Sequence, residues 1–151
     1  MLNSPLTSKA EYALVAMLDL AMYYGDPAPV PLRKIAERHE LRSEQFLVQV
    51  LLQLKIKGLV VSTRGAAGGY HLAREPERIS FWDILEAIDS TNYSNSVTER
   101  EMITSSTLFL QVAQRAWEEA NLVRQQALQK VSLRDLIEKI GFGARIPNYQ
   151  I

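Results

Sequence analysis

Residues 58–72 are the most constraining stretch of the chain, because two short runs with β-strand character flank a glycine-rich turn. Val60-Val61 favours an extended backbone, and Tyr70-His71-Leu72 would return as the second strand. We expect Gly68-Gly69 to supply the positive φ angles that a tight hairpin turn requires. Arg64 lies at the tip, where it could reach a DNA groove. The pattern predicts the wing of a DNA-binding domain, and the alternative is an ordinary surface hairpin.

The segment before this hairpin has the pattern of two helices joined by a tight turn. Residues 31–39 predict a short helix that begins with a proline. After a break, Ser43 is placed to cap a second helix that runs to Lys57, where Gly58 would end it. Two such helices followed directly by a hairpin predict a winged helix-turn-helix, with the second helix in the major groove. The alternative is an α-hairpin that only packs.

Seven segments in order along the chain carry a family resemblance. They are residues 6–14, 30–38, Phe46-Leu47 with Gln49, Arg64-Gly65, Gly68-Gly69-Tyr70, Ala116-Trp117 and 131–136. Together they resemble the Rrf-two family of bacterial transcriptional regulators, which includes the iron–sulfur-cluster regulator, the nitric-oxide-sensitive repressor and the cysteine-metabolism repressor. The resemblance implies a mostly α-helical fold with a small β-hairpin wing and a long dimerisation helix. It also implies a sequence-specific DNA-binding repressor that acts as a homodimer on a palindromic operator.

Composition by itself adds no bulk attraction to nucleic acid, because the 151-residue chain has a net charge of zero. Residues 1–75 carry nine Lys/Arg against seven Asp/Glu, whereas residues 76–151 carry eight against ten. Any basic footprint must therefore come from the local arrangement of a few cations. The sequence shows no signal peptide and no apolar run of membrane length, so we expect a cytoplasmic protein.

The expected DNA contacts gather on the second helix of the motif, on the wing and near the N-terminus. Gln45 and Gln49 could each hydrogen-bond an adenine, and Arg64 could enter a narrow A·T-rich minor groove. At Val48, where several family members carry a glutamate, an apolar side chain favours a thymine methyl group or no base contact. The full set of expected contacts with double-stranded DNA is Lys9, Arg33, Arg42, Ser43, Gln45, Phe46, Gln49, Lys55, Arg64, Gly68, Gly69 and Tyr70.

A heptad pattern predicts a long helix over roughly residues 106–130, with apolar residues at alternating steps of four and three. Such a stripe is wider than one small domain can cover, so we expect the helix to cross its twin in a homodimer. The alternative is packing of the stripe on residues 1–89 of the same chain. The expected dimer residues are Phe109, Ala113, Ala116, Trp117, Ala120, Val123 and Ala127.

These patterns divide the chain into four parts. Residues 1–89 form the expected DNA-binding domain, and residues 90–105 form a polar, turn-prone loop that serves an effector or corresponds to the family's cluster loop. Residues 106–140 contain the dimerisation helix and a closing short helix, and residues 141–151 form a C-terminal tail. We expect a small-molecule or protein effector to bind between the 80–89 helix, the loop and the long helix.

Iron–sulfur members of the family hold their cluster with cysteines before the long helix, but this sequence contains no cysteine. In many of these members a histidine completes the cluster site. Counted back from Trp117, Gln111 and Gln114 stand where the last cysteine and this histidine would fall, and amides are poor ligands for such clusters. We therefore expect no cofactor and no metal site, and we interpret His39 and His71 as packing or surface residues. The sequence shows no catalytic constellation, so we expect no enzyme. The alternative function is a regulatory module that mainly docks another protein.

Overall fold

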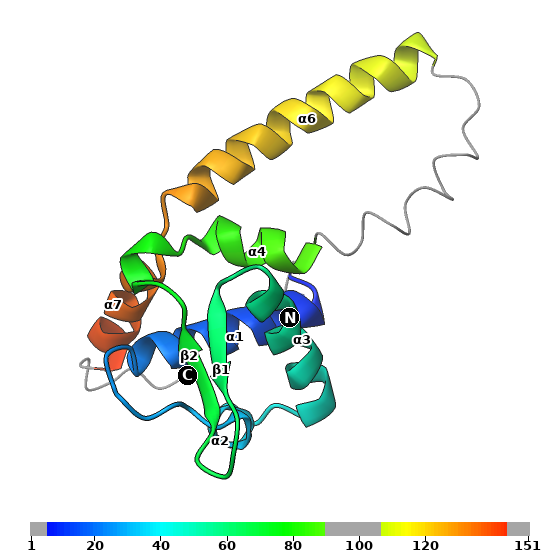
Figure 1. Ribbon diagram of the computed structural model, residues 1–151. Helices are drawn as coiled ribbons and strands as arrows, with labels where there is room; N and C mark the ends of the chain where they lie inside the picture. The colour runs from blue at the N-terminus through cyan, green and yellow to red at the C-terminus, as the bar shows by residue number, and fades with distance from the viewer. Residues whose placement is uncertain (1–5, 90–106, 145–151) are drawn as a thin grey trace.

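The computed structural model describes residues 6–89 and 107–144, and it confirms a mostly helical fold with one two-stranded hairpin (Figure 1). The elements in chain order are α1 (Ser8–Met22), α2 (Leu32–Arg38), α3 (Glu44–Ile56), β1 (Val60–Thr63), β2 (Gly69–Leu72), the 3-10 turn η1 (Pro76–Arg78), α4 (Phe81–Asp89), α6 (Leu108–Gln129) and α7 (Leu133–Ala144). The last helix therefore continues into the segment expected to be a tail. The predicted loop over residues 90–105 lies outside the described residues.

Helix α1 lies at the centre of the domain, because apolar side chains surround most of its circumference. Thr7 begins the helix by accepting a hydrogen bond from the Ala10 amide at 3.2 Å. Ala13, Ala16 and Met17 are fully buried. Helices α3, α4 and α7 and strand β2 all pack against α1. The first helix thus forms the support on which the DNA-binding elements are arranged.

Helices α2 and α3 form the predicted helix-turn-helix. The turn between them is closed by a hydrogen bond from the Leu41 amide to the Ala36 carbonyl oxygen at 2.9 Å, and it uses a positive φ of 51° at Glu40. Ser43 caps α3 as expected, with its Oγ accepting from the Phe46 amide at 3.1 Å. The side of α3 that faces the core consists of Leu47, Val50, Leu51 and Leu54, all fully buried.

Strands β1 and β2 form the predicted antiparallel hairpin, with Thr63 opposite Gly69. The expectation that Gly68 and Gly69 take positive φ angles is wrong, because the positive φ in the turn, 110°, belongs to Gly65. A Cβ atom on Gly68 would collide with the Thr63 carbonyl oxygen, and one on Gly69 would collide with the Val30 carbonyl group. Close approach of backbone segments, and not turn geometry, therefore requires these two glycines.

The segments that begin α4 and α7 lie side by side and have the same capping pattern. The Ser80 amide donates to Asp83 Oδ2 at 2.8 Å, and the Asp83 amide donates to Ser80 Oγ at 3.0 Å. Ser132 and Asp135 repeat this arrangement at 2.9 and 3.1 Å. Backbone hydrogen bonds of 2.8 and 2.9 Å join the two segments. This junction fixes the end of α6 against the start of α4.

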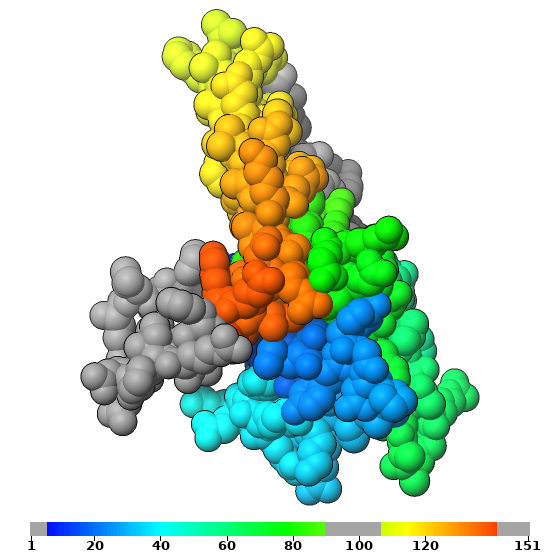
Figure 2. All heavy atoms as spheres, turned by 90° about the vertical axis from the view of Figure 1, so that its left-hand side faces the viewer, coloured from blue at the N-terminus to red at the C-terminus, as the bar shows by residue number. Residues whose placement is uncertain are grey.

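Helix α6 stands away from the rest of the domain as an arm (Figures 1 and 2). It has 22 residues, none of which is buried. The side chain of Phe109 is 89% exposed and that of Trp117 is 70% exposed. The alternative in which the apolar stripe packs on residues 1–89 is therefore wrong for the described part of the chain.

Acid is expected to weaken the attachment of α7. Arg134 Nε lies 2.7 Å from Glu77 Oε1 in η1. The pKa of Glu77 is lowered by its own backbone amide and by Arg134, and the pKa of Asp135 is lowered by the amide and hydroxyl of Ser132. A carboxyl with a lowered folded-state pKa stabilises the fold at neutral pH, and this contribution is lost as the pH falls below about 4.

Urea unfolding at about pH 7 and about pH 3 measures this loss. In a variant with both Glu77→Gln and Asp135→Asn, the difference in unfolding free energy between the two pH values is expected to be smaller than in the unchanged protein. An unchanged difference would show that these carboxyl groups do not cause the acid sensitivity.

Candidate nucleic-acid interface

The exposed side of α3 is the expected recognition surface. Gln45, Val48 and Gln49 all have exposed side chains there. They lie opposite the apolar residues that α3 buries, so core packing determines which side chains α3 presents outward. The structure therefore presents two amide side chains and one apolar side chain together, and both types of side chain can contact base edges in a major groove.

The start of α3 is held in place by Tyr12 of α1. The Ser43 amide donates to the Tyr12 hydroxyl at 3.2 Å. The rings of Tyr12 and Phe46 meet edge to face, with centroids 4.8 Å apart. Phe46 is partly buried against the core, and the Ser43 hydroxyl is used in the cap. These two expected DNA contacts thus position the helix through capping and packing.

The wing is connected to α3 through strand β1 and to the loop before α2 through strand β2, at the paired residues Ser62 and Tyr70. Lys55 Nζ donates to Ser62 Oγ at 2.7 Å, which joins the end of α3 to β1. Tyr70 exchanges two backbone hydrogen bonds with Val30, of 3.0 and 2.8 Å. Arg64 is exposed at the end of β1. Recognition helix and wing therefore form one connected unit that presents Arg64 at its tip.

The remaining expected phosphate contacts have different surroundings. Arg33 Nε lies 3.1 Å from Glu37 Oε1 one helical turn away, and Lys34 Nζ lies 4.0 Å from the same carboxylate. Arg42 is exposed in the turn before α3, and Lys9 is half-buried in the first turn of α1. The charge of Arg33 is thus partly compensated within α2, whereas Arg42 lies next to the recognition helix.

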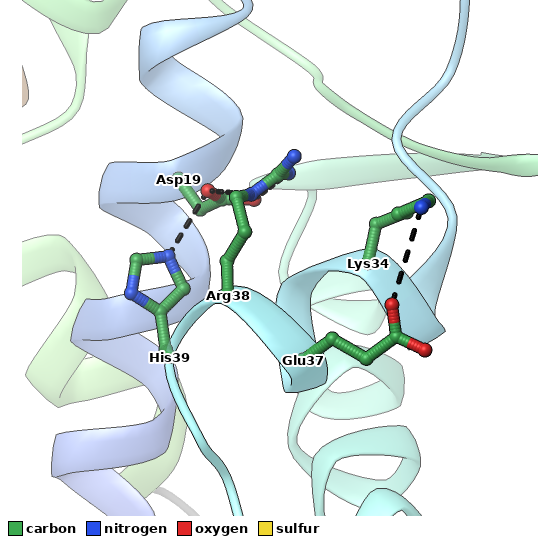
Figure 3. Close-up of polar contacts among 5 residues, drawn as sticks. All are labelled: Asp19, Lys34, Glu37, Arg38 and His39. Atoms are coloured by element: carbon green, nitrogen blue, oxygen red, sulfur yellow. Dashed lines mark hydrogen bonds and ion pairs between the residues drawn. The ribbon is translucent and has the colours of Figure 1, made fainter.

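A charged cluster around the buried Asp19, which we call the Asp19 cluster, joins α1 to the end of α2 (Figure 3). The sequence patterns did not predict it. Arg38 Nε and Nη2 donate to Asp19 Oδ1 and Oδ2 at 3.1 and 2.7 Å, and His39 Nε2 lies 3.0 Å from Oδ1. The Arg38 guanidinium also lies 4.7 Å from the centroid of the Tyr23 ring. The hydrogen bond to Asp19 is the main cause that raises the pKa of Arg38, so Arg38 stays charged.

Asp19 is the only buried polar or charged residue within the described part of the chain. A bidentate arginine–carboxylate pair has a strict geometry, so this cluster restricts the angle between α1 and α2. The signal in the sequence was an aspartate between Leu18 and Leu20, within a run of mostly apolar residues. His39, which we interpreted as a packing or surface residue, belongs to this cluster.

A cleft of about 670 Å³ separates α4 from α6, at the place where we expected an effector. The Arg124 guanidinium lies 6.0 Å from the centroid of the Trp82 ring at this cleft. None of the expected dimer residues lines this cleft. One side of α6 therefore faces the cleft, and a different side carries the apolar stripe. The lining residues are Trp82, Glu86, Asp89, Glu118, Asn121, Leu122, Arg124 and Gln125.

Comparison with known sequences identifies the family. The model of the Rrf2 family, described as an iron-dependent transcriptional regulator, matches residues 6–139. A Haemophilus influenzae protein, provisionally named an HTH-type transcriptional regulator, is 34% identical over 134 residues, which are 89% of this chain and 87% of that protein. The HTH-type transcriptional regulator IscR of Aliivibrio salmonicida is 42% identical over 86 residues, which are 57% of this chain and 50% of that protein. The chain therefore spans about half the length of this second relative.

Solved structures agree with the sequence comparison. The T. potens IscR structure has a TM-score of 0.75 and 31% identity, over 97% of this chain and 96% of that chain. CymR, the global cysteine regulator of B. subtilis, has a TM-score of 0.69 and 29% identity, over 92% of this chain and 98% of that chain. These names do not favour a module that mainly docks other proteins. None of the described helices is long and apolar enough to cross a membrane. The chain is a helix-turn-helix transcriptional regulator and belongs to the Rrf2 family.

Proposed function

We propose that this regulator is a homodimeric repressor that binds a palindromic DNA operator in the cytoplasm. The observation that carries the proposal is the exposed side of α3, held by Tyr12 beside a wing that presents Arg64. In this arrangement α3 enters the major groove, and Arg64 reaches the adjacent minor groove. We infer repression, and not activation, from the resemblance to known repressors of the family.

The contacts divide into base readers and phosphate contacts. Gln45 and Gln49 are the proposed hydrogen-bonding partners of adenine. Cations near α3 and the wing, above all Arg42 and Lys55, are the proposed phosphate contacts, which set affinity and position. The Asp19 cluster and the Tyr12 contacts act indirectly, because they determine the direction in which α3 leaves the domain.

The exposed stripe of α6 is the proposed dimer interface. A two-fold axis would place the same stripe of both copies in contact, and alanines at its centre would let the helices approach closely. The two recognition helices would then face half-sites one helical turn, about 34 Å, apart. A ligand in the cleft between α4 and α6 could change this spacing, which is our proposal for the site of the effector.

We also propose that the regulator works without the iron that its family description mentions. Iron–sulfur clusters are held by cysteine thiolates, and the sequence has none. No group of three His, Cys, Asp or Glu suited to a metal ion occurs within residues 6–89 and 107–144. The donor set therefore does not fit the cluster. Protein purified without oxygen is expected to be colourless, and visible absorption from a cluster would contradict the proposal.

Replacing Arg64 with alanine tests the wing. Loss of a specific groove contact is expected to weaken operator binding by about 1–3 kcal/mol, measured by fluorescence anisotropy on a duplex selected from a randomised pool. The matched control is Arg74→Ala, which removes an exposed arginine beyond β2 and should leave binding unchanged. Equal effects of the two substitutions would remove the wing from the mechanism.

The salt dependence of binding tests the phosphate contacts. The operator affinity of the unchanged protein should fall with salt concentration, and a plot of log affinity against log salt should have a slope near −0.9 for each phosphate contacted.

A further inference from the structure

The exposed side of α3 carries a line of large apolar side chains that the core does not explain. Val48 is 47% exposed, Leu52 is 54% exposed and Ile56 is 71% exposed. Residues four positions apart lie above one another on a helix, so these three form a single stripe, which we call the α3 stripe. The buried side of α3 is fully occupied by four other residues. The α3 stripe is therefore a separate surface and not the edge of the core.

Among the described residues, α3 packs mainly against α1, α2, α4 and β1, and these contacts leave the stripe exposed. The stripe spans about 12 Å along the helix at the usual helical rise, and the major groove of B-DNA is wide enough to admit an α-helix. It is continuous with the proposed DNA-binding surface, since Gln45 and Gln49 lie beside it. At its far end Lys55 holds Ser62 of β1. These positions favour DNA as the occupant of the stripe.

Beyond Glu44, whose carboxylate could accept a hydrogen bond from cytosine, the exposed side chains of α3 match one kind of base pair. An A·T pair presents the thymine C5-methyl group beside hydrogen-bonding atoms of adenine that glutamine recognises. Guanine is most often read by arginine or lysine. The exposed side chains of α3 before Lys55 include neither, because they are Glu44, Gln45, Val48, Gln49 and Leu52.

We propose that Val48 and Leu52 are specificity-determining residues that contact thymine methyl groups in the major groove. The operator half-sites are then selected for A·T pairs through apolar contacts with thymine and amide contacts with adenine. This inference rests on the proposed function, because it assumes that α3 enters the major groove. It goes beyond that function by naming the chemical group of the operator that the α3 stripe recognises, which is the thymine methyl group.

The test replaces thymine with deoxyuridine, which removes one methyl group and leaves every Watson–Crick hydrogen bond intact. The full chain first selects its operator from a randomised duplex pool. Each thymine of that duplex is then replaced in turn, and affinity is measured by fluorescence anisotropy. We expect a loss of about fourfold at each contacted thymine, which corresponds to about 0.8 kcal/mol for one buried methyl-sized group.

Protein variants identify which side chain contacts which methyl group. Val48→Ala and Leu52→Ala should each become insensitive to deoxyuridine at one position and keep the loss at the others, as a double-mutant cycle requires. The matched control is Met22→Ala at the end of α1, which removes a side chain that is also 54% exposed. That variant should keep the full loss at every contacted thymine.

The outcomes separate this inference from the proposed function. If selection recovers no preferred sequence, the proposed function itself fails. If it recovers a sequence that is bound equally well with deoxyuridine throughout, the protein binds DNA but the α3 stripe does not read methyl groups. Half-sites composed of G·C pairs would overturn the inference in the same way. Normal operator binding by the Leu52→Ala variant would exclude Leu52 from the contacts with thymine methyl groups.

Discussion

An Arg38→Met variant is expected to lose about 1–3 kcal/mol of unfolding free energy, the cost of leaving the buried Asp19 carboxylate without the hydrogen bonds of a partly exposed arginine. The methionine stem would still shield the Asp19 carboxylate, which is 5% exposed, but it could not compensate its charge. The other cluster partner, His39, lies 3.0 Å from that carboxylate and carries a charge only when protonated. Urea denaturation at neutral pH, followed by circular dichroism, measures the loss.

Two further variants make this result specific. Arg33→Met removes the exposed ion pair with Glu37 in the same helix, and it should cost less than about 0.5 kcal/mol. The double variant Arg38→Met with Asp19→Leu removes both charges of the pair and should recover most of the stability, because no buried carboxylate is then left without a partner. Similar losses for Arg33→Met and Arg38→Met would contradict a stabilising role of the Asp19 cluster.

An Ala120→Glu substitution is expected to separate the proposed dimer into monomers. Ala120 lies within the exposed stripe of α6, so two-fold symmetry would bring its two copies close together. Like charges at an interface cost several kcal/mol, which corresponds to a dissociation constant at least about 100 times higher. Analytical ultracentrifugation measures this change. Operator affinity should fall with it, because each monomer reads only one half-site.

The matched control places the same charge elsewhere on the same helix. Gln114 is exposed on α6 and does not belong to the expected dimer residues. Gln114→Glu should leave both the dimer and operator binding intact. A dimer that persists in the Ala120→Glu variant would assign the stripe of α6 to another contact and withdraw it from the proposed interface.

Local sequence signals were sufficient for the elements that form the motif. Ser43 predicted the start of α3 because a cap needs only its own side chain and the amides of the next turn. Gly58 predicted its end, and it takes the positive φ of 73° that an L side chain rarely adopts. The heptad spacing predicted α6 in the same way. Each of these signals acts within about one or two helical turns of chain.

The sequence by itself therefore determined the limits of α3, the hairpin and the order of the elements. Only the tertiary structure decided the pairing of Asp19 with Arg38, the packing of Phe46 on Tyr12 and the collisions that require Gly68 and Gly69. It also decided that Val48 and Leu52 stay exposed. These features depend on segments that are far apart in the chain and meet only after folding, so no local pattern specifies them.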